Sequence, residues 1–303
     1  MSSHTNLQQA PPRSLWRKTE SLRVGYAFIL PVLVLFLVFR IWPAINGMLL
    51  SFQDYRLNRS STWVGLENFR DVWQDDLFWH SLRVTFTYAL IAVPLTTVAA
   101  LSLALLINRA IKGISFFRAL YFLPYVTSLV MVAVIWQWVY RGDGGLLNTI
   151  LTNLGLSAVP WLESDRMVLP SLAIMAAWKG VGYSMMILLA GLKAIPPHLT
   201  EASEVDGATG AQTFWKITLP LLKPVLFFVI VIETIGSFQV FDAIYVMTGG
   251  GPVRASYSLV YMIYDEGFQF QQFGYASAIG VVLFLITFGV MMIQRLMFGR
   301  SDT

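Results

Sequence analysis

Glu201–Pro224, with the sequence EASEVDGATGAQTFWKITLPLLKP, lies between two long apolar runs in the second half of the chain. Pro196-Pro197 precedes it, and proline suits the first turn of a helix. Three apolar residues then recur at intervals of three, which predicts one short amphipathic helix; they are Leu199, Ala202 and Val205.

The rest of this stretch predicts a turn and a second helix. Asp206-Gly207 is a turn signal. A short helix is predicted from Ala208 to Ile217, with Thr209 as its N-cap. We expect Leu219-Pro220 to end that helix, because the residue before a proline is pushed out of the helical region.

The composition is that of a membrane protein. The 303 residues are 56% hydrophobic and only 13% charged, and the mean hydropathy is +0.63. There is no cysteine, which excludes disulfides and thiolate metal sites. The net charge of +4 is modest, so its distribution along the chain is more informative than its size.

Six apolar stretches are long enough to cross a bilayer, which takes about 20 helical residues. They are Tyr26–Leu50, Val84–Ile107, Phe117–Tyr140, Met167–Leu192, Leu221–Phe241 and Gly274–Ile293. The sequence therefore predicts an all-α membrane protein with six transmembrane helices. We expect a cytoplasmic tail over residues 1–23, a six-helix membrane domain over 24–298 with a loop at 196–220, and a tail over 299–303. A cleaved signal peptide is disfavoured, because the first apolar run is too long.

The distribution of Lys and Arg predicts the orientation. With the N-terminus inside, more of these residues fall in the inside segments than in the outside loops. The second inside loop alone carries Arg109, Lys112 and Arg118. We expect both termini inside (N-in/C-in), which places the loop 196–220 in the cytoplasm.

The pattern E-A-S-x-x-D-G-A, followed by F-W-K-I-x-L-P-L-x-x-P, resembles the cytoplasmic "EAA" loop of permease subunits of binding-protein-dependent ABC importers. It is most similar to the carbohydrate-uptake branch that includes the maltose and glycerol-3-phosphate permeases. Three further segments resemble this branch: Arg118–Ser128, Trp178–Met186 and Phe273–Phe284. Ser203 departs from the usual alanine, and Val84 stands where an asparagine is frequent. The alternative for the loop is an interfacial helix pair that only anchors the bundle.

The resemblance implies a type I ABC importer permease fold with a coupling-helix loop, in a multi-pass protein of a prokaryotic cytoplasmic (inner) membrane. It implies alternating access driven by a separate ATPase, which holds ATP and Mg, so this chain itself binds no cofactor. The implied ATPase-coupling residues are Glu201, Ala202, Ser203, Asp206, Gly207, Ala208 and Phe214. The implied partners are a second, different permease subunit in a heterodimer, two ABC ATPase subunits, an extracytoplasmic solute-binding protein and the lipid bilayer. We expect no nucleic-acid partner.

Enzyme chemistry of the chain's own is not indicated. No GxxxxGK[ST] pattern is present, and Thr248–Pro252 lacks the Lys-Ser/Thr ending of a phosphate loop. There is no HExxH pattern, and the three histidines are scattered, so neither a metal site nor a catalytic triad is predicted. We therefore expect a transporter subunit and not an enzyme.

Charges within the apolar stretches are costly and mark possible pathway residues. Away from the ends of these stretches the charges are Arg40, Lys179 and Glu233, and Arg40 can snorkel to an interface. The predicted solute-pathway faces on the fourth and fifth spans are Ala176, Lys179, Gly180 and Tyr183, and Glu233, Gly236, Ser237 and Val240. Two interpretations remain open: Lys179 and Glu233 line a wet cavity, or they form a structural ion pair.

Several functional hypotheses follow. The first is a sugar importer permease, and the second is the same architecture for glycerol-3-phosphate or a glycerophosphodiester, which a lysine would suit. The third is a secondary transporter with Lys179 and Glu233 as a proton relay, for which an EAA loop has no use. A structural scaffold would need no charges within its spans. The aromatic loop of residues 51–83 suggests either an interfacial belt or a docking surface for the binding protein.

Overall fold

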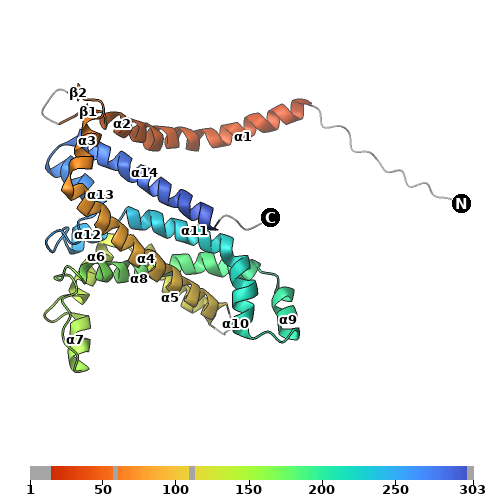
Figure 1. The fold of residues 1–303 in the computed structure, drawn as a ribbon. Coiled ribbons are helices and arrows are strands. Elements are labelled where there is room, and N and C mark those ends of the chain that lie inside the picture. Colours follow the sequence, from red (N-terminus) through yellow and green to blue (C-terminus); the bar gives the residue numbers. More distant parts are fainter. Residues whose placement is uncertain (1–14, 57–60, 109–112, 299–303) are drawn as a thin grey trace. The chain divides into compact units, whose positions relative to one another are not determined.

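The computed structural model describes residues 15–56, 61–108 and 113–298 (Figure 1). Most of the predicted N-terminal tail, the whole C-terminal tail, Arg109 and Lys112 lie outside these ranges. The chain divides into two compact units, residues 1–50 and 51–303.

The first unit is one long helical rod made of α1 (Leu15–Phe36), the π-helical turn η1 (Leu37–Ile41) and α2 (Trp42–Leu50). Its apolar part, Tyr26–Leu50, coincides with the first predicted span, and none of it is buried inside this chain. Helix begins at Leu15, within the segment predicted as a tail.

The second unit is a bundle of helices with one two-stranded antiparallel sheet. Its elements are β1 (Gln53–Asp54), β2 (Thr62–Trp63), α3 (Glu67–Gln74), α4 (Asp76–Ile107), α5 (Ile114–Val126), α6 (Leu129–Val139), α7 (Leu146–Asn153), α8 (Val168–Ala194), α9 (Pro197–Val205), α10 (Gly210–Thr213), η2 (Phe214–Thr218), α11 (Leu219–Phe238), α12 (Asp242–Met247), α13 (Leu259–Tyr264), η3 (Asp265–Gln269) and α14 (Phe273–Phe298).

Five helices in the described parts of the chain are long and apolar enough to cross a membrane. The third predicted span, Phe117–Tyr140, is instead a pair of shorter helices, α5 and α6, which meet at 97°. The backbone turns extended at Thr127, whose hydroxyl donates to the carbonyl of Pro124 at 2.6 Å. The apolar pattern of the sequence did not indicate this break. A count of six spans holds only if the bent pair is taken as one.

The core of the second unit forms around α4 and α8. Small side chains on α4, including Ala100 and Ala104, are completely buried and pack near Met185 and Leu188 of α8. Gly182 of α8 lies so close to α5 that a Cβ atom there would overlap the backbone carbonyl of Tyr121. Small residues that let helices approach closely are typical of membrane bundles, where packing replaces the hydrophobic effect between helices.

The fifth span does not begin where the sequence predicted. Helix runs without a break from Gly210 to Phe238, through the proline that was expected to end the loop helix. The N–H of Leu219 bonds to the carbonyl of Phe214, five residues back, which makes a π turn directly before Pro220. A proline ring clashes with the carbonyl four residues before it in an α-helix, and the wider π turn relieves that clash. The first unit has the same arrangement, in which the N–H of Trp42 bonds to Leu37 before Pro43.

Candidate functional site

The loop 196–218 forms a helical hairpin that begins as predicted. Pro197 occupies the first turn of α9. At the other end of α9, Gly207 has a φ of 75° and its N–H bonds to the carbonyl of Glu204, while the N–H of Ala208 bonds to Ser203. This pair of bonds is the Schellman motif, which needs a left-handed residue after the helix. The predicted glycine turn is therefore confirmed.

Thr209 caps the second arm of the hairpin, as predicted. Its hydroxyl accepts the N–H of Gln212, and the side chain of Gln212 accepts the N–H of Thr209 at 2.8 Å. This reciprocal capping box fixes the start of the helix that becomes the fifth span. Figure 1 shows α9 and α10 at the end of the second unit opposite α3, α12 and α13.

Ser203, the departure from the family's alanine, lies inside the hairpin. It is 6% exposed, donates to the carbonyl of Thr200 at 2.7 Å, and lies 2.9 Å from the hydroxyl of Thr213. The bond to Thr213 joins α9 to α10 directly. The serine therefore contributes a link between the two arms, a role that the sequence did not indicate.

The outward face of the hairpin combines acidic and apolar side chains. Of the predicted coupling residues, those exposed are Glu201, Ala202, Asp206 and Gly207, while Ala208 and Phe214 are half-buried. Val205 and Trp215, which were not among the predicted coupling residues, are also exposed, at 88% and 66%. Exposed apolar side chains on a polar loop are typical of surfaces that bind another protein or a membrane.

A double-mutant cycle tests the link between the two arms. We expect Ser203→Ala, Thr213→Val and the double change to lower the apparent Tm of the purified complex by similar amounts. The two hydroxyls share one hydrogen bond worth about 1 kcal/mol, so removing the second adds little once the first is gone. Additive effects of the two changes would show that this bond does not stabilise the hairpin.

The second candidate site lies where the broken third span meets α8. The ammonium of Lys179 donates to the backbone carbonyl of Tyr125 at 3.0 Å. It also lies 5.4 Å from the centre of the aromatic ring of Tyr125. Tyr183 stacks on that ring at 4.5 Å and 10°. Tyr125 belongs to the last turn of α5, where carbonyls lack helical partners and a cation is stabilising.

Glu233 of α11 lies against the same part of α8. It accepts a hydrogen bond of 2.5 Å from Ser184, and its Oε1 is 3.9 Å from the position a Cβ atom would take at Gly180. The one ion pair among the residues that the structure describes joins Arg56 to Asp54. The Lys179–Glu233 ion pair considered from the sequence is therefore not formed.

The remaining predicted pathway residues are divided between surface and core. Ala176, Gly180 and Tyr183 are half-buried on α8, and Gly236 of α11 is exposed. Ser237 and Val240 are buried, and Val240 lies beyond the end of α11 at Phe238. The expectation that Val240 continues the helical face was wrong, because the helix ends first. Tyr125 and Ser184, which hold the two charges, were missed because nothing local in the sequence links them to Lys179 and Glu233.

Comparison with known proteins gives a consistent match. Residues 85–301 match the family model described as "Binding-protein-dependent transport system inner membrane component". The chain is 37% identical to the probable ABC transporter permease protein YesP of Bacillus subtilis, over 94% of each chain. It is 37% identical to the trehalose/maltose transport system permease protein MalF of Thermococcus litoralis, over 89% of this chain and 91% of the relative.

A further relative and two solved structures are also similar. The sn-glycerol-3-phosphate transport system permease protein UgpA of Agrobacterium fabrum is 34% identical over 89% of this chain and 92% of its own. A bacterial ABC transporter that imports the acidic polysaccharide alginate superposes with a TM-score of 0.82 at 25% identity, covering 95% of this chain and 99% of the other. A bacterial alginate ABC transporter in complex with its alginate pentasaccharide-bound periplasmic protein gives 0.81 at 25% identity, over 94% and 97%.

Proposed function

Because this chain belongs to the family of binding-protein-dependent transport system inner membrane components, we propose that it forms half of the pathway through which an ATP-driven importer moves a sugar or sugar-like solute. As a permease subunit of an ABC importer in the inner membrane, it is not itself an ATPase. The complex includes a periplasmic binding protein. The solute, the residues that contact it and the other subunits are parts of the proposal.

The hairpin 196–218 is the proposed contact with the ATPase. The excess of Lys and Arg in the segments on its side supports a cytoplasmic location. Exposed Val205 and Trp215 offer apolar anchors, and the exposed acidic residues Glu201 and Asp206 belong to the same hairpin. In the proposed cycle, ATP closes two partner ATPase subunits, the hairpins of this chain and of a second, different permease move together, and the pathway opens outward.

The observation that carries the solute site is that Lys179 and Glu233 both contact or belong to the middle of α8 within the spans and do not form an ion pair with each other. Lys179 gives one of its three donors to Tyr125, which leaves two for a solute. Glu233 has a single hydrogen bond, from Ser184. A cation, a carboxylate and the stacked Tyr125–Tyr183 rings together suit a molecule that carries hydroxyl groups on an apolar ring face. The relatives named for trehalose/maltose and alginate transport support a sugar or sugar-like solute.

A second candidate solute is glycerol-3-phosphate or a glycerophosphodiester. The specific observation that favours it is the same unpaired Lys179, because a compact ammonium suits a phosphate. A relative named for sn-glycerol-3-phosphate transport is 34% identical. A secondary transporter that uses Lys179 and Glu233 as a proton relay is disfavoured, since permeases of this family are driven by a partner ATPase.

Solute uptake into proteoliposomes tests this site. We expect Lys179→Met, which keeps length but removes charge, to reduce uptake by about tenfold, and Lys179→Arg to retain more of it. The assay uses the complete complex and binding protein with maltose, trehalose, glycerol-3-phosphate and glycerophosphocholine in parallel. The amount of assembled complex serves as the control for folding.

The outcome also separates the two solute classes. Uptake of a neutral sugar that depends on both Lys179 and Glu233, tested by Glu233→Gln, supports the first candidate. Uptake confined to the phosphorylated compounds and lost in Lys179→Met supports the second. Unchanged uptake in Lys179→Met would show that the lysine only caps the end of α5.

A further inference from the structure

A polar cavity of about 150 Å³ lies at the end of the second unit opposite the hairpin 196–218. It is lined by Asp54, Tyr55, Arg56, Val64, Glu67, Asn68, Asp71, Gln272 and Tyr275. Segments distant in sequence build it together: a β-bridge joins Arg56 to Gln272, and the N–H of Gly274 bonds to the carbonyl of Tyr55 at 3.3 Å. The cavity is therefore part of the folded unit and not of a single loop.

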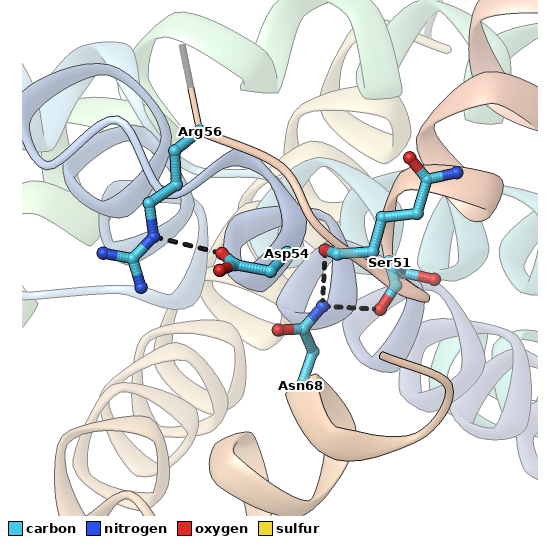
Figure 2. A network of polar contacts seen from close by, with 5 residues as sticks. Ser51, Asp54, Arg56 and Asn68 are labelled. Carbon is cyan, nitrogen blue, oxygen red and sulfur yellow. Dashed lines mark hydrogen bonds and ion pairs between the residues drawn. The ribbon is translucent and has the colours of Figure 1, made fainter. Parts of the chain in front are cut away.

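Asn68 presents an unpartnered acceptor at this cavity. Its side chain is 8% exposed, and its amide nitrogen donates to the carbonyls of Ser51 at 2.9 Å and Gln53 at 3.0 Å. Two carbonyl partners require the nitrogen on that side, so the amide orientation is determined. Figure 2 shows the amide oxygen of Asn68 directed away from both bonds. Within the described ranges no donor to this oxygen is found, and the oxygen opens into the cavity, since it is not among the fully buried polar atoms that lack a partner.

The charges around Asn68 call for a positively charged donor. Of the three carboxylates that line the cavity, Asp54 is paired with Arg56 at 3.0 Å. Glu67 and Asp71 stand four residues apart on one face of α3, and neither forms an ion pair in the part of the chain that the structure describes. Two like charges at this spacing repel each other, and a cation between them removes the repulsion.

The surroundings of the cavity increase its negative potential. Tyr275, on its wall, donates to Asp75 at 2.7 Å. Burial, together with the negative charges of Asp75 and Asp265, raises the pKa of Glu266. A ligand that carries several N–H donors and a positive charge would satisfy the free acceptors and reduce this repulsion.

We propose that this cavity receives one lysine or arginine side chain of the extracytoplasmic solute-binding protein. This inference rests on the proposed function, which places the cavity on the outer side. The volume suits one side chain. Three large apolar residues of the same region are exposed to 64% or more, namely Trp63, Leu66 and Trp73. Exposed tryptophans beside a polar socket are typical of protein–protein interfaces, and they favour a protein partner over a free cation.

The test is a titration of the reconstituted complex with the purified, solute-loaded binding protein. We expect the double change Glu67→Gln/Asp71→Asn to raise the half-saturating concentration for ATPase stimulation by about tenfold or more. The maximal rate at saturation should change little, because only docking is weakened. The wild-type half-saturating concentration should also rise with salt, and the double variant should lose most of this dependence.

A matched control is the double change Asp76→Asn/Asp143→Asn, which removes two exposed acidic charges predicted for the same side but not lining the cavity. It should leave the half-saturating concentration within about twofold. Charge reversal, Glu67→Lys/Asp71→Lys, should be rescued by exchanging one surface lysine or arginine of the binding protein for glutamate.

Three outcomes are decisive. Equal half-saturating concentrations for the wild type and Glu67→Gln/Asp71→Asn would overturn the inference. So would thermal stabilisation of the wild type, but not of that variant, by millimolar spermidine or free arginine, because the site would then hold a small cation. If the binding protein fails to stimulate the wild type at all, the proposed function fails first, which distinguishes the two failures.

Discussion

Replacing Gly207 by proline is expected to reduce binding-protein-stimulated ATP hydrolysis by about 100-fold, the factor that corresponds to ~3 kcal/mol. Gly207 has a φ of 75°, whereas proline is fixed near −65°. Proline also lacks the N–H that bonds to Glu204. The left-handed turn between α9 and α10 cannot form with proline at this position. The exposed face that carries Val205 would then no longer bind the ATPase. ATPase activity of the complex in nanodiscs measures this.

The matched control is Gly207→Asn, because asparagine tolerates the left-handed conformation better than other non-glycine residues. It should retain most of the stimulation. Gly210→Ala is a second control, since a Cβ atom there meets no atom within 4 Å. The subunit carrying Gly207→Pro should still insert, because the hairpin lies outside the packed core. Normal stimulation in Gly207→Pro would refute a coupling role for this turn.

Gly182→Val is expected to eliminate the folded subunit. A Cβ atom at Gly182 would overlap the carbonyl of Tyr121 and lie 2.9 Å from the Cα of Phe122, and backbone atoms cannot turn aside as side chains do. Gly182 is buried on the face of α8 that packs against α5. Separating these helices would cost more than ~3 kcal/mol, and it would also remove Lys179 from the carbonyl of Tyr125. Size-exclusion chromatography of the detergent-solubilised protein gives the folded fraction.

Gly180→Ala is the control for this prediction, on the same helix and two residues away. Its Cβ atom would make ordinary contacts, 3.8 Å from Thr96 and 3.9 Å from Glu233. We expect a normal yield from Gly180→Ala. A monodisperse Gly182→Val protein with unchanged Tm would show that α5 and α8 are not packed as closely as described.

The sequence was sufficient wherever a local rule decided the structure. The apolar runs predicted the membrane class, and Tyr26–Leu50 matches the first span. Gly207 and Thr209 were predicted correctly because a left-handed turn and an N-cap depend on the residues next to them. Leu219 was predicted wrongly, since the rule for residues before proline does not consider a π turn that moves the clashing carbonyl aside.

The rest depended on contacts between distant segments. The break after Tyr125 leaves a carbonyl without a helical partner, and that carbonyl is satisfied by Lys179, 54 residues later in the chain. Hydropathy counts α5 and α6 as one run, so it cannot locate such a break. Lys179 and Glu233 were recognised as unusual because charges are rare in apolar spans. Their partners became clear only from the way α5, α8 and α11 pack.

The helix that starts at the cap of Thr209 and ends at Phe238 is continuous but bent, and Figure 1 shows α10 and α11 running in different directions. A π turn, Pro220 and Pro224 lie between its two parts, and such positions bend more easily than regular helix because backbone hydrogen bonds are missing or shifted there. Leu222 and Val229 hold the later part in the core. A displacement of the hairpin by the proposed ATPase therefore meets a hinge before it reaches the membrane, and the stiffness of that hinge sets how much of the movement arrives at the outer end of α11.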